Sequence, residues 1–287
     1  MVRRLNSFTL ACILCLFLSC SKDKKTPLPD PAVTPPPETP PGQGPGDQNK
    51  GIYSDSLFFV QQTDITIKPV NAKAGTYSSI PDGLKLEEAT GEIDINKSET
   101  GLKYKVTFTP SGGGETQTSY VIISGINYQD KIYNLSKGDS VAVPIYNANS
   151  KLALPGANKS SVFDKDGDCK KAGIVVNNND GRINLAQSVR NQSIDTGATE
   201  EVKLRYSIND NSNKAPNGLN VKIYFYRTAK EIPQYLTDLL EERKTSILTE
   251  ASAPSAIQSS SLITASLSTN AKKATRARPP CIIVVSR

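Results

Sequence analysis

Residues 83–95 read GLKLEEATGEIDI, in which two leucines alternate with polar residues before a Thr-Gly pair and two isoleucines alternate with polar residues after it. Strict alternation of apolar and polar residues is typical of a β-strand with one buried face. Glycine supplies the positive φ that tight turns require. The stretch therefore predicts a strand, a turn and a second strand. We expect it to form a scaffold, because carboxylates are the only catalytic residue type within it.

The same pattern continues on both sides of this stretch, with turn residues about every ten positions, as expected for an antiparallel β-sandwich. Along one run, Tyr104, Val106 and Phe108 share a face while lysines and a threonine share the other, which is the pattern of a half-buried strand. The predicted strands of this first half are Ser56–Val60, Ile65–Pro69, Leu84–Leu86, Glu92–Ile95, Leu102–Thr109 and Thr118–Ser124.

Residues 80–109 read IPDGLKLEEATGEIDINKSETGLKYKVTFT and resemble the bacterial immunoglobulin-like, cadherin-like domains. Those domains carry a phrase of the form P-x-G-L-x-L-x-x-x-T-G-x-I, followed by a glycine and a Y-x-V-x-F strand. The matching positions are Pro81, Gly83, Leu84, Leu86, Thr90, Gly91, Ile93, Gly101, Tyr104, Val106 and Phe108. The resemblance implies an immunoglobulin/cadherin-like β-sandwich over residues 51–125, of a kind that usually serves as a spacer or an adhesive module.

Residues 126–287 predict a second β-rich domain. Its predicted strands are Ile126–Tyr133, Ser140–Tyr146, Gly173–Val176, Arg182–Val189, Glu201–Ile208, Leu219–Arg227 and the apolar run Cys281–Val285. Apolar residues at helical spacing predict a packed helix over residues 232–247. A Ser/Ala/Thr-rich stretch predicts a flexible loop over residues 249–279. The expected fold class is therefore all-β, with two β-sandwich-like, immunoglobulin-like domains, the second of which carries one packed α-helix.

The beginning of the chain predicts a targeting segment. Two arginines precede an apolar run, Phe8 to Leu18, which is too short to cross a bilayer as a helix. The run ends at Ser19-Cys20, which resembles the lipobox of bacterial lipoproteins. The resemblance implies that residues 1–19 are a signal peptide and that Cys20 carries a lipid that includes palmitate. It also implies that the protein is an exported lipoprotein of the Bacteroidetes type.

Residues 20–50 predict a linker, because a stretch rich in proline and glycine cannot bury enough apolar surface to fold. Proline-rich chain is extended and semi-rigid, so this linker would hold the folded part away from a membrane. The expected location is the bacterial outer membrane, with attachment through the lipid. The periplasmic face and the surface face both stay open.

The composition argues against several functional classes. The chain has no histidine, which removes the commonest general base and the usual zinc ligand. Cleavage after Ser19 removes two arginines and no acid, so the net charge falls from +6 to +4. This weak and dispersed charge does not indicate a nucleic-acid partner. We expect no enzymatic activity and no cofactor, apart from the calcium alternative below.

Two cysteines remain beyond the lipidated one, and an exported protein lies in an oxidising compartment. A disulfide between Cys169 and Cys281 is expected on that ground. The alternative is two buried free thiols, because a sequence does not fix the distance between two Cα atoms.

The acidic string at Asp164, Asp166 and Asp168 is like a calcium-binding loop, because alternating carboxylates can project oxygens toward one centre. However, Cys169 stands where an EF-hand loop has glycine, and Val175 stands where it has its bidentate glutamate. A solvated acidic turn is the favoured interpretation, and a calcium site is the alternative.

Together these features favour a non-catalytic, membrane-anchored envelope lipoprotein with a structural, adhesive or partner-binding role. The alternative is a surface glycan-binding protein of a polysaccharide uptake system, because Tyr224 and Tyr226 share one face of a predicted strand and aromatic faces stack on sugar rings. The expected partners are the membrane and an envelope protein or glycan that the residues do not identify.

Overall fold

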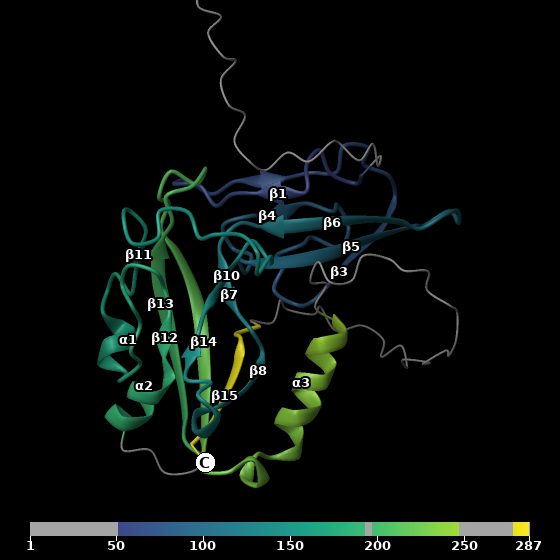
Figure 1. Ribbon diagram of the computed structural model, residues 1–287. Coiled ribbons are helices and arrows are strands. Elements are labelled where there is room, and N and C mark those ends of the chain that lie inside the picture. Colours follow the sequence, from purple (N-terminus) through teal and green to yellow (C-terminus); the bar gives the residue numbers. More distant parts are fainter. Residues whose placement is uncertain (1–50, 193–196, 247–277, 287) are drawn as a thin grey trace, which may run out of the picture. The chain divides into compact units, whose positions relative to one another are not determined.

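The computed structural model describes residues 51–192, 197–246 and 278–286, which belong to one compact unit (Figure 1). The predicted signal peptide, Cys20 and the predicted linker lie outside the described residues, as does nearly all of the predicted loop 249–279. The described part is predominantly β-structure and consists of two sandwich-like β units in tandem.

The first sandwich, here called the first repeat, covers residues 51–124. Its larger sheet has the strand order β1-β6-β5-β3, and its smaller sheet pairs β2 with β4. The strands are β1 (Leu57–Phe58), β2 (Thr66–Ile67), β3 (Gly75–Ile80), β4 (Ile93–Asp94), β5 (Leu102–Pro110) and β6 (Gln117–Ile123). The structure adds β3 to the predicted strands, and it reduces the predicted strand Leu84–Leu86 to a single bridge between Leu86 and Ile93.

The core of the first repeat forms as the sequence predicts. Tyr104, Val106 and Phe108 on β5 all point inward and are at most 2% exposed. Tyr77 on β3 lies opposite Phe108, with the two ring centroids 4.7 Å apart. The alternating face of one strand therefore anchors the packing between the two sheets of this repeat.

The second sandwich, here called the second repeat, covers residues 125–286. Its strands are β7 (Ile126–Tyr128), β8 (Lys131–Asn134), β9 (Val141–Ala142), β10 (Pro144–Tyr146), β11 (Val162–Phe163), β12 (Ile183–Asn184), β13 (Thr199–Ser207), β14 (Asn217–Tyr226) and β15 (Cys281–Val285). Its helices are α1 (Asp168–Lys171), α2 (Leu185–Gln192) and α3 (Gln234–Ser246), with 3-10 turns η1 (Leu135–Lys137) and η2 (Ala229–Glu231).

The two repeats contain the same turn motif at a constant offset of 90 residues, because residues 83–98 correspond to residues 173–188. In both copies the turn glycine, Gly91 or Gly181, donates its N–H at 2.8 Å to the carbonyl of the residue four positions earlier. The carbonyl of each glycine accepts a hydrogen bond from a buried tyrosine hydroxyl, Tyr53 in one copy and Tyr128 in the other. The equivalent turns of the two repeats are therefore held by the same kind of hydrogen bond, from a buried tyrosine hydroxyl to the carbonyl of the turn glycine.

The larger sheet of the second repeat has one more strand than the larger sheet of the first. In the first repeat, β1 pairs directly and in parallel with β6. In the second, β8 and β14 take the corresponding places, but β15 lies between them and runs parallel to both (Figure 1). The apolar run Cys281–Val285 is a buried strand, as predicted, and it lies inside a sheet of order β11-β13-β14-β15-β8.

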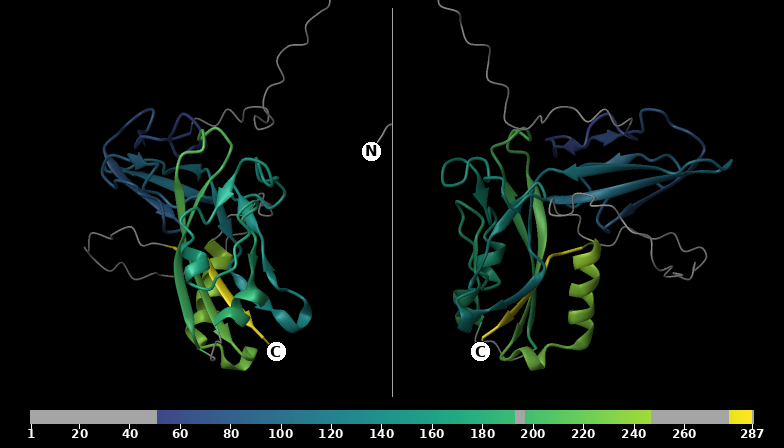
Figure 2. Two further views of the ribbon diagram at one scale, coloured as in Figure 1. Left: turned by 90° about the vertical axis from the view of Figure 1, so that its left-hand side faces the viewer. Right: turned by 45° about the vertical axis from the view of Figure 1, so that its right-hand side comes forward.

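Helix α3 confirms the predicted helix and covers one face of this sheet (Figure 2). Its side chains Leu236 and Leu240 form an apolar cluster with Tyr224, Tyr226 and Ile283 of the two strands below. The opposite faces of β14 and β15 contribute to the main core of the second repeat. The strands are consequently buried on both sides, and β14, α3 and β15 form a parallel β-α-β crossover.

The predicted strand Arg182–Val189 is wrong beyond Asn184, where the chain enters α2. The Asn184 side chain accepts the N–H of Gln187 at 2.9 Å, and the Ser188 hydroxyl donates to the Asn184 carbonyl at 2.7 Å. A side-chain acceptor at this place satisfies an N–H that the first turn of a helix leaves free. The short apolar pattern fits either period, and in the structure these side-chain hydrogen bonds accompany the first turn of α2.

The repeats meet without an intervening linker, because β6 ends at Ile123 and β7 begins at Ile126. At this junction the Tyr206 hydroxyl lies 2.7 Å from Thr100 Oγ1 and accepts the N–H of Ile126 at 3.2 Å. Burial raises the pKa of Tyr206 to about 12, so the hydroxyl keeps its proton. The backbone of Gly101 also packs directly against Ile126.

We expect Gly101→Ala to destabilise the protein by about 2–5 kcal/mol. Gly101 has a φ of +71°, and a Cβ there would overlap the backbone of Ile126 and Asn127. The left-handed conformation costs an L-residue about 1–2 kcal/mol, and overpacking adds about 1–3 kcal/mol. Gly113→Ala is the matched control, because Gly113 has a φ of +78° and open space around it. Equal losses in urea unfolding for both variants would contradict the close packing at the junction.

Candidate functional site

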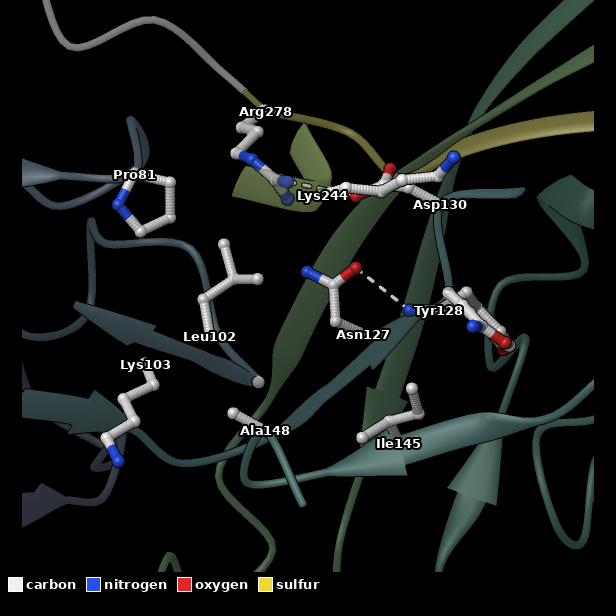
Figure 3. Close-up of a pocket in the computed structure, with 12 residues that line it drawn as sticks. Pro81, Leu102, Lys103, Asn127, Tyr128, Asp130, Ile145, Ala148, Lys244 and Arg278 are labelled. Atoms are coloured by element: carbon white, nitrogen blue, oxygen red, sulfur yellow. Dashed lines mark hydrogen bonds and ion pairs between the residues drawn. The ribbon is translucent and has the colours of Figure 1, made fainter. Parts of the chain in front are cut away.

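A cavity of about 220 Å³ lies where the two repeats, α3 and the chain before β15 meet (Figure 3). Its apolar lining comes from Pro81 and Leu102 of the first repeat and from Ile145 and Ala148 of the second. The close approach of Gly101 to the start of the second repeat brings these walls together. The site is therefore a product of the junction between the repeats.

The charged groups of the cavity are Lys103, Lys244, Arg278 and Asp130. Figure 3 shows Arg278, Lys244 and Asp130 along one edge of the cavity, with Ala148 across from them. The Lys103 ammonium lies 5.1 Å from the ring centroid of an exposed tyrosine, and the Lys244 ammonium pairs with an exposed glutamate. The formal charge of this lining is positive, with three cations against one acid.

Asp130 lies at the centre of a buried charge cluster, with its side chain only 4% exposed. Its Oδ1 accepts from Arg243 Nη1 at 2.6 Å and from the N–H of Cys281 at 2.5 Å. Its Oδ2 accepts from Arg278 Nη2 at 2.9 Å. One carboxylate thus holds the end of α3, the segment before β15 and the first residue of β15 in place.

Glu99 joins this cluster from the first repeat. Its Oε1 accepts the backbone N–H of Arg278 at 2.6 Å. Its Oε2 is the one buried side-chain nitrogen or oxygen in the described part of the chain that has no hydrogen-bond partner. Burial raises the pKa of the Glu99 carboxyl, and the N–H and the charge of Arg278 oppose this effect.

We expect Glu99→Gln to remove a component of the pH dependence of stability. A folded-state pKa above the ordinary value of 4.5 means that this carboxyl stabilises the fold below about pH 4.5 and that its contribution is lost as pH rises through the folded pKa. Glutamine keeps the oxygen acceptor and does not titrate. The unfolding free energy of the variant minus that of the wild type should therefore increase from about pH 4.5 upward and then level off. Urea unfolding at a series of pH values measures this difference, and a constant difference would refute it.

The structure gives the three carboxylates of the acidic string separate partners. Asp164 accepts the N–H groups of Cys169 and Lys170, at 2.9 and 3.2 Å, at the first turn of α1. Asp166 pairs with a neighbouring arginine at 2.7 Å, and Asp168 pairs with the lysine three residues later at 2.9 Å. Among the described residues, no group of three or more Cys, Asp or Glu side chains is placed to hold a metal ion.

The predicted disulfide is wrong, because Cys169 and Cys281 are both free and buried. Cys169 belongs to the core between the sheets of the second repeat, and Cys281 belongs to the cluster beneath α3. The five-stranded sheet therefore separates the two thiols. Burial raises the pKa of Cys281 to about 11 and also raises that of Cys169, so both are in the unreactive thiol form at neutral pH.

Tyr224 and Tyr226, the tyrosines considered for sugar stacking, lie under α3 and are 9% and 7% exposed. The cavity residues, by contrast, come from segments far apart in the sequence that carry no local motif. Arg278 falls at the basic end of the predicted loop, and Asp130 falls within the predicted strand Ile126–Tyr133, which the structure divides into β7 and β8. Only the folded chain brings these two residues together.

No family model matches the chain, and no curated protein matches it. Two similar solved structures are Drosophila N-cadherin EC1-4, at 12% identity over 59% of this chain and 47% of that one, and mouse clustered PcdhgC3 EC1-3, at 8% identity over 59% and 65%. Both TM-scores are 0.18, and the chain spans less than two thirds of either structure. In the part of the chain that the structure describes, no helix is long and apolar enough to cross a membrane. The strand order and pairing of the two repeats establish an all-β, sandwich-like fold.

Proposed function

We propose that the chain is a non-catalytic envelope lipoprotein, attached to the outer membrane through Cys20, with a structural, adhesive or partner-binding role. The observation that supports this proposal is the junction at Tyr206, where buried hydrogen bonds join two sandwiches without a linker. Such a junction fixes the orientation of one repeat relative to the other, as a spacer or a display scaffold requires. The lack of histidine agrees with a role outside catalysis.

Nuclear magnetic resonance relaxation tests the scaffold. We expect the two repeats to tumble with one correlation time in the wild type and to separate in Tyr206→Phe, which removes the hydroxyl from both hydrogen bonds. Independent tumbling in the wild type would count against a spacer role.

Metabolic labelling with an alkyne palmitate tests the anchor. The wild type should incorporate the label, and Cys20→Ala should not. Electrophoresis in gels that contain polysaccharides tests the glycan-binding alternative, because retardation of the purified protein would favour it.

A further inference from the structure

The junction cavity is large enough for a small organic molecule. An apolar cavity of about 150 Å³ accommodates a benzene-sized ligand, and this cavity measures about 220 Å³. Leu102 and Ile145 form part of its apolar surface, and both repeats contribute to the wall. A ligand with a short apolar body would bury that body here, which is the usual basis of small-molecule affinity.

Arg278 supplies directed hydrogen-bond donors at the edge of the cavity. Its side chain is only 6% exposed, and Asp130 is its side-chain partner through one nitrogen, Nη2. A guanidinium carries five N–H donors. Besides Nη2, the guanidinium has two further nitrogens, Nε and Nη1, that carry N–H donors. Since Arg278 lines the cavity, these donors are available to a ligand.

The charge of the cavity selects an anion. Asp130 is the one acid among the lining residues, against Lys103, Lys244 and Arg278, and it is already bound by two arginines and a backbone N–H. Two acids outside the lining also contact these cations, because Glu241 pairs with Lys244 and Glu99 accepts the N–H of Arg278. A guanidinium binds a carboxylate through paired hydrogen bonds with defined geometry. We infer that the junction cavity binds a small amphipathic carboxylate, with the carboxylate on Arg278 and the apolar body against Leu102 and Ile145.

Isothermal titration calorimetry of the whole mature chain with three ligands of one body size tests this inference. The ligands are octanoate, octanol and octylammonium, which differ in the charge of the head group. We expect octanoate to bind at least tenfold more tightly than octanol, and octylammonium to bind most weakly. Equal affinity for octanoate and octanol would overturn the assignment of an anion site, and no binding of octanoate at millimolar concentration would overturn the site itself.

Three variants locate the bound ligand. Arg278→Lys keeps the charge but loses the planar fork, so we expect at least a tenfold loss of octanoate affinity. Ile145→Trp fills the cavity from an outward position on β10 and should abolish binding without touching the charge cluster. Lys244→Gln should weaken octanoate several-fold and leave octanol unchanged, whereas Lys159→Gln is the matched control, because Lys159 is exposed and does not line the cavity.

These variants remain informative if Arg278→Lys does not fold, because Ile145 and Lys244 lie outside the buried cluster. Unchanged octanoate affinity in Ile145→Trp would place the ligand elsewhere and overturn the inference. The inference does not depend on the proposed display role. The tumbling and labelling experiments test that role without a ligand, so they and the ligand titrations can fail independently.

Discussion

A chain that ends at Pro280 is expected to lose the fold of the second repeat. The missing strand β15 contributes Ile282, Ile283, Val284 and Val285, each at most 1% exposed. Burial of one such side chain contributes about 1.5–3 kcal/mol, so the loss of four approaches the whole stability of a domain, about 5–15 kcal/mol. The truncation also leaves β8 and β14 without their shared neighbour.

Hydrogen exchange followed by mass spectrometry resolves the two repeats in this experiment. We expect peptides from β13 and β14 to lose protection, and peptides from β5 and β6 to keep most of theirs, because the first repeat has a core of its own. A chain that ends at Val285 is the control and should behave as the wild type does. Unchanged protection in β14 after removal of β15 would show that β8 can close the sheet alone, as β1 does in the first repeat.

Asp130→Ala is expected to destabilise the protein by about 3–5 kcal/mol, because removal of one partner from a buried ion pair leaves the other charge uncompensated. Here two arginines, Arg243 and Arg278, lose the same carboxylate, and so does the N–H of Cys281. The midpoint of urea unfolding, followed by circular dichroism, measures the loss. The effect should be specific to the buried cluster.

Asp168→Ala provides the matched control, because it removes an aspartate from an exposed ion pair with Lys171. Exposed pairs contribute little to stability, since water screens them. Its unfolding midpoint should stay close to that of the wild type. If the two alanine variants lost the same stability, the buried cluster would not stabilise the fold beyond a surface contact.

The strands of both repeats could largely be predicted from the sequence, because their periodicity is local. Alternation along Leu102–Thr109 and the Thr-Gly turn at residues 90–91 define a strand and a turn without reference to the rest of the chain. The helix at the end was predicted for the same reason. The segment after Asn184 shows the limit, since INLAQSV fits the period of a strand and that of a helix.

The partners of β15 could not be predicted, although the strand itself could. Five apolar residues indicate burial, but their neighbours in the sheet lie about 60 and 150 residues earlier in the chain. No local sequence pattern identifies strand partners at such separations, because the pairing depends on closure of a long loop. The disulfide was mispredicted for the same reason, because only the sheet shows that Cys169 and Cys281 face opposite sides. The tandem repeat did leave a signal, namely GLKLEEATGEIDI against GIVVNNNDGRINL.

The position of β15 also sets the order of events during biosynthesis. Every strand of the first repeat precedes residue 124, so this repeat can close while the chain is still emerging. The sheet of the second repeat is complete only after Cys281–Val285 has been made, because this strand follows every other described strand of the sheet along the chain. Until then, the facing edges of β8 and β14 are unpaired and open to wrong neighbours. A nascent chain of this protein therefore passes through a stage in which the first repeat is complete while the second still lacks a strand from the middle of its sheet.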